Sequence, residues 1–296
     1  MSKTIDPSVL RIGVPKGSLE TSTLDLLHRA GYEIDVSERS YFPAINDPTI
    51  QLIMFRAQEM SRYVEDGVMD IGITGHDWVV ENGSSVHEVC ELAYSKATRK
   101  PARWVLAVPE ESEVTQPEQL AGAIIATELV NTTRAYFAAR KIKVKKVEFS
   151  WGATEVKARL VDAIVDITET GSSLRANKLR IVDTVLTSTT RLIANKQSWA
   201  DAAKRERIED LALLLRGAIA ARQKVGLKMN VPRAKLNQVL AILPAEKSPT
   251  VNPLADEDWV ALEVMVDEQV ERHLVPQLCR AGATAIISYP LNKIVG

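Results

Sequence analysis

The 296-residue sequence predicts an α/β protein with two lobes, followed by a smaller βαββαβ unit at its C-terminal end. Three observations lead to this fold class. The chain is longer than one hydrophobic core comfortably supports, so two or three domains are expected. Apolar strands alternate with amphipathic helices from Leu10 onward, which indicates parallel βαβ units with right-handed crossovers. After Gly226 the strand and helix pattern begins again.

The composition excludes several classes of protein. With 37 basic and 38 acidic residues the net charge is -1, which argues against a nucleic-acid partner. No stretch approaches the roughly 20 apolar residues of a membrane span, and the N-terminal segment lacks a long apolar core. We therefore expect a cytoplasmic protein without a membrane partner. Cys90 and Cys279 lie far apart in the sequence, which favours free thiols over a disulfide or a zinc site.

The first lobe begins with a strand over Leu10–Val14. A helix is expected from about Leu19 to Ala30, with Ser18 as its N-cap and Gly31 as its stop. Lys16 then lies at the carboxyl end of a strand, where open α/β sheets bind ligands. A solvated loop lysine is the alternative interpretation.

A second βαβ unit follows, with strands over Ile50–Phe55 and Met69–Thr74 and a helix over Ala57–Glu65. Arg56 also falls at the carboxyl end of a strand. A guanidinium there can hold a phosphate in a bidentate grip, and a surface ion pair with Glu59 is the ordinary alternative.

The second lobe is expected to start near Trp104. Its predicted strands and helices, in order, are Val105–Val108, the short helix Pro117–Leu120, Ala123–Ala126, a helix from an Asn131 cap to about Lys141, and Val147–Phe149. The helix turns Tyr136 and Phe137 inward. Strands over Arg180–Leu186 and Arg191–Asn195 then carry the chain back toward the first lobe, and the two crossings form a hinge.

An internal repeat supports two equivalent lobes. The segments Tyr63–Gly75 and Val156–Gly171 share a helix end, an acidic residue, an apolar strand and a terminal Thr-Gly element. Each lobe would present one loop to a shared cleft. This is the arrangement of the type II periplasmic-binding-protein fold.

The C-terminal part begins with a long amphipathic helix, which we expect Ser198 to cap. The βαββαβ pattern that follows consists of Leu227–Val231, a helix from Pro232 to about Pro244, Thr250–Leu254, Trp259–Val266, Glu268–Ala281 and Thr284–Tyr289. This order fits a ferredoxin-like unit. Such a unit either senses a small ligand or serves oligomerisation alone.

The most informative stretch is Val161–Arg175, an apolar strand that runs into a turn of small and hydroxylated residues. Backbone N–H groups at a helix start attract phosphate, and Gly171 permits close approach of the backbone. Asp166 lies at the carboxyl end of the strand, where a carboxylate accepts hydrogen bonds from ribose hydroxyls. The stretch therefore suits a phosphorylated ribose, although an ordinary strand–turn–helix has the same composition.

Together with four other motifs, this stretch resembles ATP phosphoribosyltransferase, the first enzyme of histidine biosynthesis, in its long form with a C-terminal regulatory domain. The motifs are VPKGSLE (Val14–Glu20), DIGITGHDW (Asp70–Trp78), SWGATEV (Ser150–Val156) and SPTVNPL (Ser248–Leu254). The resemblance covers nearly the whole chain in the order of the family. Two departures are visible: Ser173 replaces the usual Thr, and Lys157-Ala158-Arg159 replaces a connection that usually contains proline.

The resemblance implies an activity and a division of the chain. N1 of ATP displaces pyrophosphate from C1 of 5-phosphoribosyl pyrophosphate (PRPP), with Mg²⁺ as cofactor, and L-histidine inhibits. The chain is expected to form a homo-oligomer between a dimer and a hexamer. The expected domains are catalytic lobe I (1–103 and 184–210), catalytic lobe II (104–183) and a regulatory domain (211–296).

The resemblance also directs attention to particular residues. The expected catalytic residues are Lys16, Arg56, Glu155 and Asp166, with Glu155 and Asp166 also as Mg²⁺ ligands. The expected PRPP contacts are Asp166, Thr168, Glu169, Thr170, Gly171, Ser172, Ser173 and Leu174. The expected ATP contacts are Gly17, Asp70, Thr74 and Gly75, and polar contacts for histidine are expected at Asn230, Ser248 and Thr250.

One rival class remains, a bilobal phosphorylated-ligand or solute-binding protein without catalysis. Such a protein is normally exported, and the sequence shows no signal peptide. It also has no need of the C-terminal unit. No Ser-His-acid or Cys-His set is visible, and of four scattered histidines only His76 lies in a candidate loop.

Overall fold

The computed structural model describes residues 8–37, 40–94, 101–152, 154–244 and 249–296. The chain forms two compact units, one that ends at Ala212 and one that starts at Leu213 and includes Arg29–Gly31. The helix α8 (Ala202–Ala221) contributes residues to both units.

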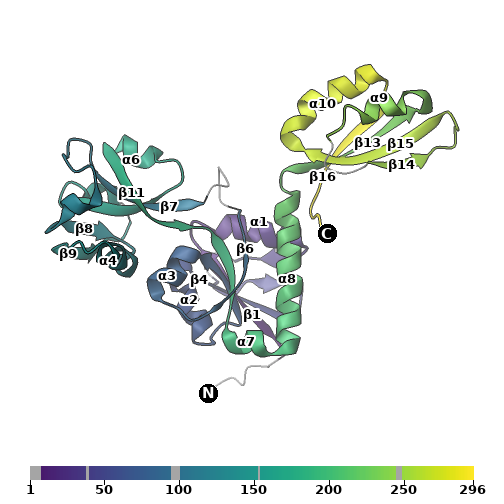
Figure 1. The fold of residues 1–296 in the computed structure, drawn as a ribbon. Helices are drawn as coiled ribbons and strands as arrows, with labels where there is room; N and C mark the ends of the chain where they lie inside the picture. Colours follow the sequence, from purple (N-terminus) through teal and green to yellow (C-terminus); the bar gives the residue numbers. More distant parts are fainter. Residues whose placement is uncertain (1–7, 38–39, 95–100, 153, 245–248) are drawn as a thin grey trace. The chain divides into compact units, whose positions relative to one another are not determined.

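The first unit contains two five-stranded sheets, one in each lobe (Figure 1). The strands of the first sheet are, in spatial order, β4 (Ile50–Arg56), β1 (Leu10–Lys16), β5 (Ile71–Gly75), β12 (Thr190–Ala194) and β6 (His87–Glu91). Its helices are α1 (Glu20–Ala30), α2 (Ala57–Glu65), α3 (His76–Asn82) and α7 (Lys196–Ala200), and a small hairpin pairs β2 (Ile34–Asp35) with β3 (Ala44–Ile45).

The second sheet follows the same plan. Its strands are, in spatial order, β9 (Lys146–Phe149), β8 (Ile124–Thr127), β10 (Ala163–Thr168), β7 (Ala102–Pro109) and β11 (Leu179–Ser188). The helical segments are η1 (Pro117–Leu120), α4 (Val130–Ala139), α5 (Thr154–Lys157) and α6 (Ser172–Ala176).

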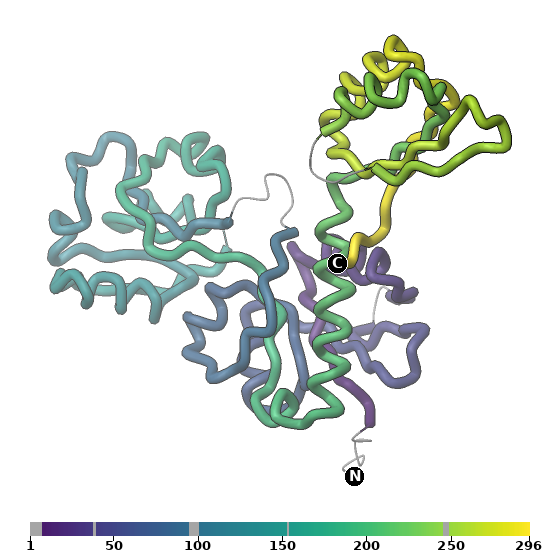
Figure 2. The backbone as a smooth tube through the Cα atoms, turned by 45° about the vertical axis from the view of Figure 1, so that its right-hand side comes forward, coloured from purple at the N-terminus to yellow at the C-terminus, as the bar shows by residue number. Residues whose placement is uncertain are grey.

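The two sheets have equivalent topology. In each, the second strand in spatial order pairs in parallel with its two neighbours, as β1 does with β4 and β5, and β8 does with β9 and β10. The fourth strand, β12 or β7, pairs antiparallel with both of its neighbours. The predicted repeat therefore places β5 and β10 at the centres of matching sheets, and the two-lobed fold is confirmed. Figure 2 shows the chain path between the lobes along β11 and β12.

The second unit is a four-stranded antiparallel sheet in the order β14-β15-β13-β16, with bounds Thr250–Pro253, Trp259–Asp267, Lys224–Pro232 and Thr284–Pro290. Its helical segments are η2 (Arg233–Lys235), α9 (Leu236–Leu240) and α10 (Glu268–Ala281). This is the strand order of a ferredoxin-like βαββαβ unit, as predicted. The single predicted helix from Pro232 to Pro244 is wrong, because η2 and α9 share that segment and α9 ends at Leu240.

Large apolar side chains form a separate core in each sheet. Trp104, Tyr136 and Phe137 are buried in the second lobe, and the last two confirm the predicted inward face of α4. In the second unit, alternate residues of β13 such as Leu227, Met229 and Val231 pack beneath the helices. The opposite parity of β13 therefore faces away from the helices.

Two predicted helix caps are wrong. Leu129, not Asn131, is the N-cap residue of α4, and the side chain of Leu129 makes no cap hydrogen bond. The N–H groups of Asn131 and Thr132 donate to the Glu81 carboxylate of α3, each at 2.9 Å. Ser198 lies inside α7, which Asn195 caps by accepting from the N–H groups of Gln197 and Ser198.

Candidate active site

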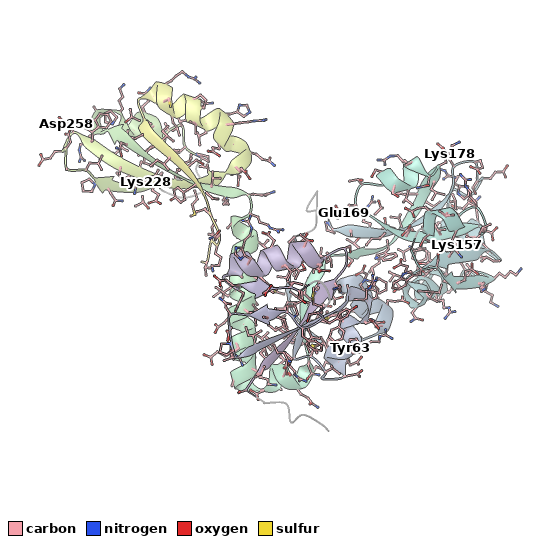
Figure 3. All side chains as sticks on the ribbon, turned by 180° about the vertical axis from the view of Figure 1, so that it is seen from behind. Tyr63, Lys157, Glu169, Lys178, Lys228 and Asp258 are labelled. Carbon is pink, nitrogen blue, oxygen red and sulfur yellow. The ribbon has the colours of Figure 1, made fainter. Side chains whose placement is uncertain are left out.

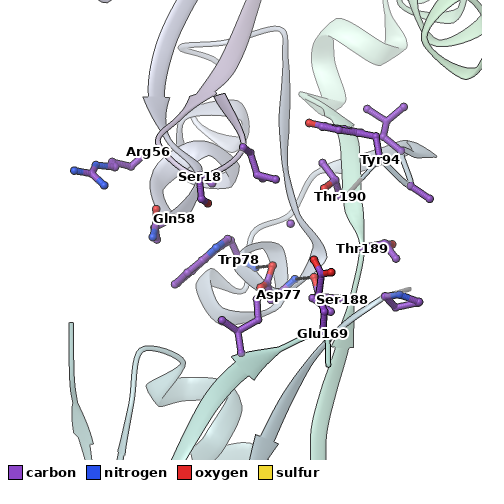
Figure 4. Close-up of a pocket in the computed structure, with 18 of the residues that line it drawn as sticks. Ser18, Arg56, Gln58, Asp77, Trp78, Tyr94, Glu169, Ser188, Thr189 and Thr190 are labelled. Carbon is purple, nitrogen blue, oxygen red and sulfur yellow. Dashed lines mark hydrogen bonds between the residues drawn. The ribbon is translucent and has the colours of Figure 1, made fainter. Parts of the chain in front are cut away.

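A cavity of about 460 Å³ lies where strands of both lobes end (Figure 4). Lys16, Arg56 and Gly75 reach it from the carboxyl ends of the parallel strands β1, β4 and β5, and Thr168 reaches it from the end of β10. Ser188, Thr189 and Thr190 line it from the connection between β11 and β12. The cavity is thus at the edge where parallel sheets bind ligands.

Lys16 and Arg56 are opposite each other in the register of the parallel strands β1 and β4. Two cations at the ends of adjacent strands make a site for an anion with more than one phosphate. Lys16 Nζ lies 4.8 Å from the centroid of the Tyr41 ring. Within the part of the chain that the structure describes, no ion pair joins Arg56 to Glu59, so the ordinary alternative for this arginine is not observed.

Gly17 follows Lys16 with a φ of 98°. Its N–H donates to Glu20 Oε2 at 3.1 Å, which closes the turn into α1. This left-handed backbone favours glycine and directs the chain away from the strand end. Among the expected ATP contacts, Gly75 lines the cavity, whereas Gly17 does not.

The turn after β10 is organised by its own hydroxyl groups. Gly171 has a φ of 74°, and its N–H donates to Thr168 Oγ1 at 2.7 Å. The hydroxyls of Thr170 and Ser172 lie 2.9 Å apart, and Arg175 Nη1 donates to the Thr170 carbonyl at 3.2 Å. Ser172 and Ser173 are exposed at the start of α6, while the side chain of Leu174 is buried beneath it. The side chains of Ser172 and Ser173 are therefore exposed on a turn whose backbone is fixed by hydrogen bonds.

Two expected acids lie beside this turn. Ser173 Oγ donates to Glu155 Oε1 at 2.5 Å, so α5 and α6 are joined at the turn. Burial raises the pKa of Asp166 to about 6, and the charges of Glu155 and Glu128 act in the same direction. Glu128 was not among the residues expected from the sequence, because it comes from the loop after β8 and its proximity to Asp166 depends on the pairing of β8 with β10.

Asp77 is a buried carboxyl group at the cavity wall that sequence analysis did not single out. Its Oδ2 accepts from Trp104 Nε1 at 2.7 Å, and its N–H donates to Ser188 Oγ at 3.0 Å. Burial raises its pKa, and the hydrogen bond from Trp104 opposes that rise. Since Trp104 and Ser188 belong to β7 and β11, Asp77 joins the two lobes from α3. The only signal in the sequence was its place in the DIGITGHDW motif.

Asp70, one of the expected ATP contacts, does not line the cavity. It is fully buried just before β5, at the opposite end of that strand from the cavity. Its carboxylate accepts hydrogen bonds from Arg11 at 3.0 Å, Ser198 at 2.7 Å and Lys204 at 2.8 Å. Burial alone would raise the pKa of Asp70, but these hydrogen bonds hold it well below its usual range. The Asp70 carboxylate therefore has a structural role, because it links β1, α7 and α8 through hydrogen bonds.

Thr74 is also buried, and its hydroxyl donates to the Ala57 carbonyl at 2.7 Å. This bond joins β5 to the start of α2. His76, the first residue of α3, lies 3.0 Å from Glu88 through Nδ1. Neither Thr74 nor His76 lines the cavity.

The expected histidine contacts lie in the second unit. Asn230 pairs with Ala261 across the sheet, and Ala261 pairs with Asn252, two residues beyond Thr250. By this register Asn230 and Thr250 share the face of the sheet opposite the helices. Lys228 shares that face, and Figure 3 shows it on the side away from α10. Ser248 lies outside the described residues.

The residues that the structure describes contain no group of three or more His, Cys, Asp or Glu side chains arranged to hold a metal ion. Across the same ranges, none of the helices has the length and apolar character needed to cross a membrane.

Comparison with known proteins identifies the family. The sequence pattern described as ATP phosphoribosyltransferase matches residues 56–217, and the pattern described as the HisG C-terminal domain matches residues 221–293. The chain belongs to the ATP phosphoribosyltransferase family. It is a transferase of histidine biosynthesis in the long form, with the C-terminal domain that the second pattern describes, and the non-catalytic alternative is excluded.

Relatives of this family agree over nearly the full length. The ATP phosphoribosyltransferase of Chlorobium phaeobacteroides is 57% identical over 97% of this chain and 98% of its own. That of Solibacter usitatus is 55% identical over 97% of this chain and 99% of its own. Among solved structures, the ATP phosphoribosyl transferase (HisG:HisZ) complex from Thermotoga maritima matches with a TM-score of 0.60 and 29% identity, covering 70% of this chain and 96% of that chain.

Proposed function

We propose that this chain transfers the 5-phosphoribosyl group of PRPP to N1 of ATP, giving N1-(5-phosphoribosyl)-ATP and pyrophosphate. The bond from C1 to the pyrophosphate oxygen breaks, and the bond from C1 to N1 of the purine forms with inversion at C1. The transition state has oxocarbenium character, so catalysis depends on charge placement more than on a protein nucleophile.

The observation that carries this proposal is the convergence of two cations and the β10 turn on one cavity. Lys16 and Arg56 line the same cavity as Thr168 and Glu169. In the proposal, the cations stabilise the departing pyrophosphate. The turn over Thr168–Leu174 holds the 5-phosphate through hydroxyl and N–H groups. The lobes on either side exclude water from the reacting atoms.

Asp166 and Glu155 take the ribose and the developing positive charge. A carboxylate near C1 favours the transition state over the neutral ground state, and this difference accelerates the reaction. The raised pKa of Asp166, about 6, follows first from burial and then from its acidic neighbours. A carboxyl group with a pKa of about 6 is mostly ionised at neutral pH and becomes protonated in mild acid.

Magnesium is the proposed cofactor. The carboxylates of Glu155 and Asp166 are oxygen donors of the kind this ion prefers, and they meet at one turn of the second lobe. When bound, the ion neutralises charge on the substrate phosphates. The residues of this chain position the ribose and the pyrophosphate around it.

Regulation by L-histidine belongs to the same proposal. A zwitterionic amino acid needs polar partners once it is desolvated, and the shared face of Asn230 and Thr250 offers an amide and a hydroxyl. In the same proposal, lobe I comprises residues 1–103 and 184–210, lobe II comprises residues 104–183, and the regulatory domain comprises residues 211–296. The chain forms a homo-oligomer in the cytoplasm. Assembly finds support in the T. maritima relative, which is described as a complex.

The test is release of pyrophosphate from PRPP by the full-length chain with Mg²⁺, with and without ATP. The proposal expects release that requires both substrates and is suppressed by L-histidine. Release without ATP would indicate PRPP hydrolysis and would contradict the transfer reaction. Lys16→Ala should lower turnover, because it removes a positive charge that stabilises the departing pyrophosphate.

A further inference from the structure

A second cavity, of about 480 Å³, adjoins the first. Arg56, Gln58 and Trp78 line both cavities, so the two are neighbouring parts of one cleft. Figure 4 shows these three residues on the same side of the first cavity. A reaction between two large substrates needs such a pair of adjoining spaces, because the reacting atoms must meet at the boundary.

Two exposed aromatic side chains form one wall of the second cavity. Phe149 is 58% exposed and Trp151 is 57% exposed, and their ring centroids lie 5.9 Å apart with an angle of 44° between the planes. The N–H of Gly152 donates to Glu128 Oε1 at 3.1 Å, which anchors the backbone next to Trp151. Large aromatic surfaces on an anchored turn favour stacking with a flat ring.

Residues of α2 and α3 also line the second cavity and carry most of its polar groups. The carboxylate of Glu81 is occupied by the N–H groups at the start of α4. Asn82 Nδ2 donates to the backbone carbonyl of Gln58 at 2.8 Å and to Ser61 Oγ at 2.9 Å. Within the described ranges the carboxamide of Gln58 makes no hydrogen bond, so both of its polar ends are available to a ligand.

Charged groups of the second cavity divide by location. Arg56 lies at the boundary with the first cavity, and Arg62 lies in the last turn of α2. Within the described residues Arg62 makes no ion pair, although Glu59 is one turn away on the same helix. Glu128 is close enough to Asp166 for its charge to raise the pKa of that carboxyl. The second cavity is therefore lined by two arginines and by Glu128, whose charge acts on Asp166.

We propose that the second cavity binds the purine ring of ATP, stacked on Trp151 and Phe149, with Gln58 reading the edge formed by N6 and N7. This inference rests on the proposed function and locates the adenine of ATP, one of the two substrates, in the second cavity. N1 is the nucleophile and has to remain free, so the protein must recognise adenine elsewhere. A carboxamide accepts from the N6 amino group and donates to N7, and both groups lie on the edge away from N1.

The remaining groups are consistent with a nucleoside triphosphate. Arg62, in the last turn of α2, provides a cation for the phosphates of ATP, while Arg56 at the boundary serves the pyrophosphate of PRPP. A purine with oxygen at position 6 presents two acceptors on the same edge, and one of them would face the Gln58 carbonyl oxygen. Gln58 is therefore the residue that favours adenine over hypoxanthine.

The first experiment measures pyrophosphate release by full-length enzyme while ATP is varied at saturating PRPP. Trp151→Ala should raise the KM for ATP by about tenfold or more, the scale of one lost base–aromatic stack. The KM for PRPP should remain close to that of the unchanged enzyme, and Trp151→Phe should restore most of the ATP affinity. Leu160→Ala is the control, since Leu160 is 77% exposed and lines neither cavity.

The second experiment measures inhibition by inosine triphosphate, because N1 of hypoxanthine carries a proton and cannot attack C1. Gln58→Leu should lower the ratio of the Ki for inosine triphosphate to the KM for ATP, which expresses the preference for ATP, by about tenfold or more. The structure also predicts that ATP quenches tryptophan fluorescence in the unchanged enzyme and much less in Trp151→Phe. That binding signal does not depend on turnover.

The outcomes separate the two proposals. If the unchanged enzyme releases no pyrophosphate from ATP and PRPP, the proposed function fails. If it does so, but Trp151→Ala leaves the KM for ATP unchanged and Gln58→Leu leaves the ATP preference unchanged, the purine assignment is overturned and the proposed function stands.

Discussion

The indole Nε1 of Trp104 donates a 2.7 Å hydrogen bond to Oδ2 of Asp77, although the two residues belong to different lobes of the first unit. Both are buried. Asp77 also lines the candidate active site, so a bond that joins the lobes ends at the cavity wall. The relative placement of the lobes and the shape of the site are therefore linked through one carboxyl group.

Trp104→Phe should destabilise the first unit by about 1–3 kcal/mol, because the buried Asp77 oxygen loses its donor. Scanning calorimetry should show a lower midpoint for one transition. Trp259→Phe is a matched control in the second unit, where the indole is partly exposed and makes no hydrogen bond among the described residues. Equal losses in the two variants would show that the bond to Asp77 contributes nothing beyond aromatic packing.

The pKa of Asp166 predicts an acidic limb in the activity profile. Turnover should rise with pH through about 6, as the carboxyl group loses its proton. Asp166→Asn should lower turnover more than PRPP affinity, and its remaining activity should lack this limb. Glu155→Gln removes a neighbouring negative charge, so it should shift the limb of the remaining activity to lower pH. A limb that stays in place in both variants would assign the titration to another group.

Asp166 should also make folding stability depend on pH. Its folded-state pKa, about 6, lies above the ordinary value, so the folded state binds the proton more tightly than the unfolded chain. Its contribution is fully present below the unfolded pKa and is lost as pH rises through about 6. At pH near 8, Asp166→Asn should therefore increase the free energy of unfolding, by at most about 3 kcal/mol. Denaturant titrations at acidic and alkaline pH would reveal an opposite trend if the environment instead stabilised the carboxylate.

Gly171→Val should weaken PRPP binding by about tenfold or more, or about 1.4 kcal/mol. A Cβ at Gly171 would lie 3.0 Å from Arg175 Nη1, and the φ of +74° disfavours a branched side chain. The matched control is Gly122→Val, because Gly122 has a φ of +80° with no atom within 4 Å of its Cβ position. Calorimetric titration with PRPP checks both variants. Equal affinities in folded proteins would remove Gly171 from the phosphate site.

Thr250→Val should weaken L-histidine binding while uninhibited turnover stays close to that of the unchanged enzyme. The substitution keeps the exposed β14 position and its strand propensity, but removes a hydroxyl from the face shared with Asn230. Calorimetry with histidine and inhibition assays would be run on the intact chain. Inhibition that competes with PRPP and is unchanged in Thr250→Val would place histidine outside the C-terminal unit.

Local sequence determined most of the secondary structure. The predicted bounds of α2, η1 and α10 match the observed ones, because apolar spacing and turn residues act over a few positions. The repeat of Tyr63–Gly75 in Val156–Gly171 also predicted two equivalent lobes, since similar local patterns build similar strands. The family followed from motifs that lie in the same order along the chain.

Tertiary structure alone decided which polar groups meet. Serine is a common N-cap residue, yet the hydroxyl of Ser198 donates to Asp70, a residue 128 positions away. The start of α4 likewise takes its acceptor from Glu81 of the other lobe, and Glu128 reaches Asp166 only through strand pairing. A helix terminus or a buried carboxylate binds whichever partner the packed lobes bring within hydrogen-bond distance. The local sequence determines which groups require a hydrogen-bond partner, whereas the packing of distant segments determines which residue supplies that partner.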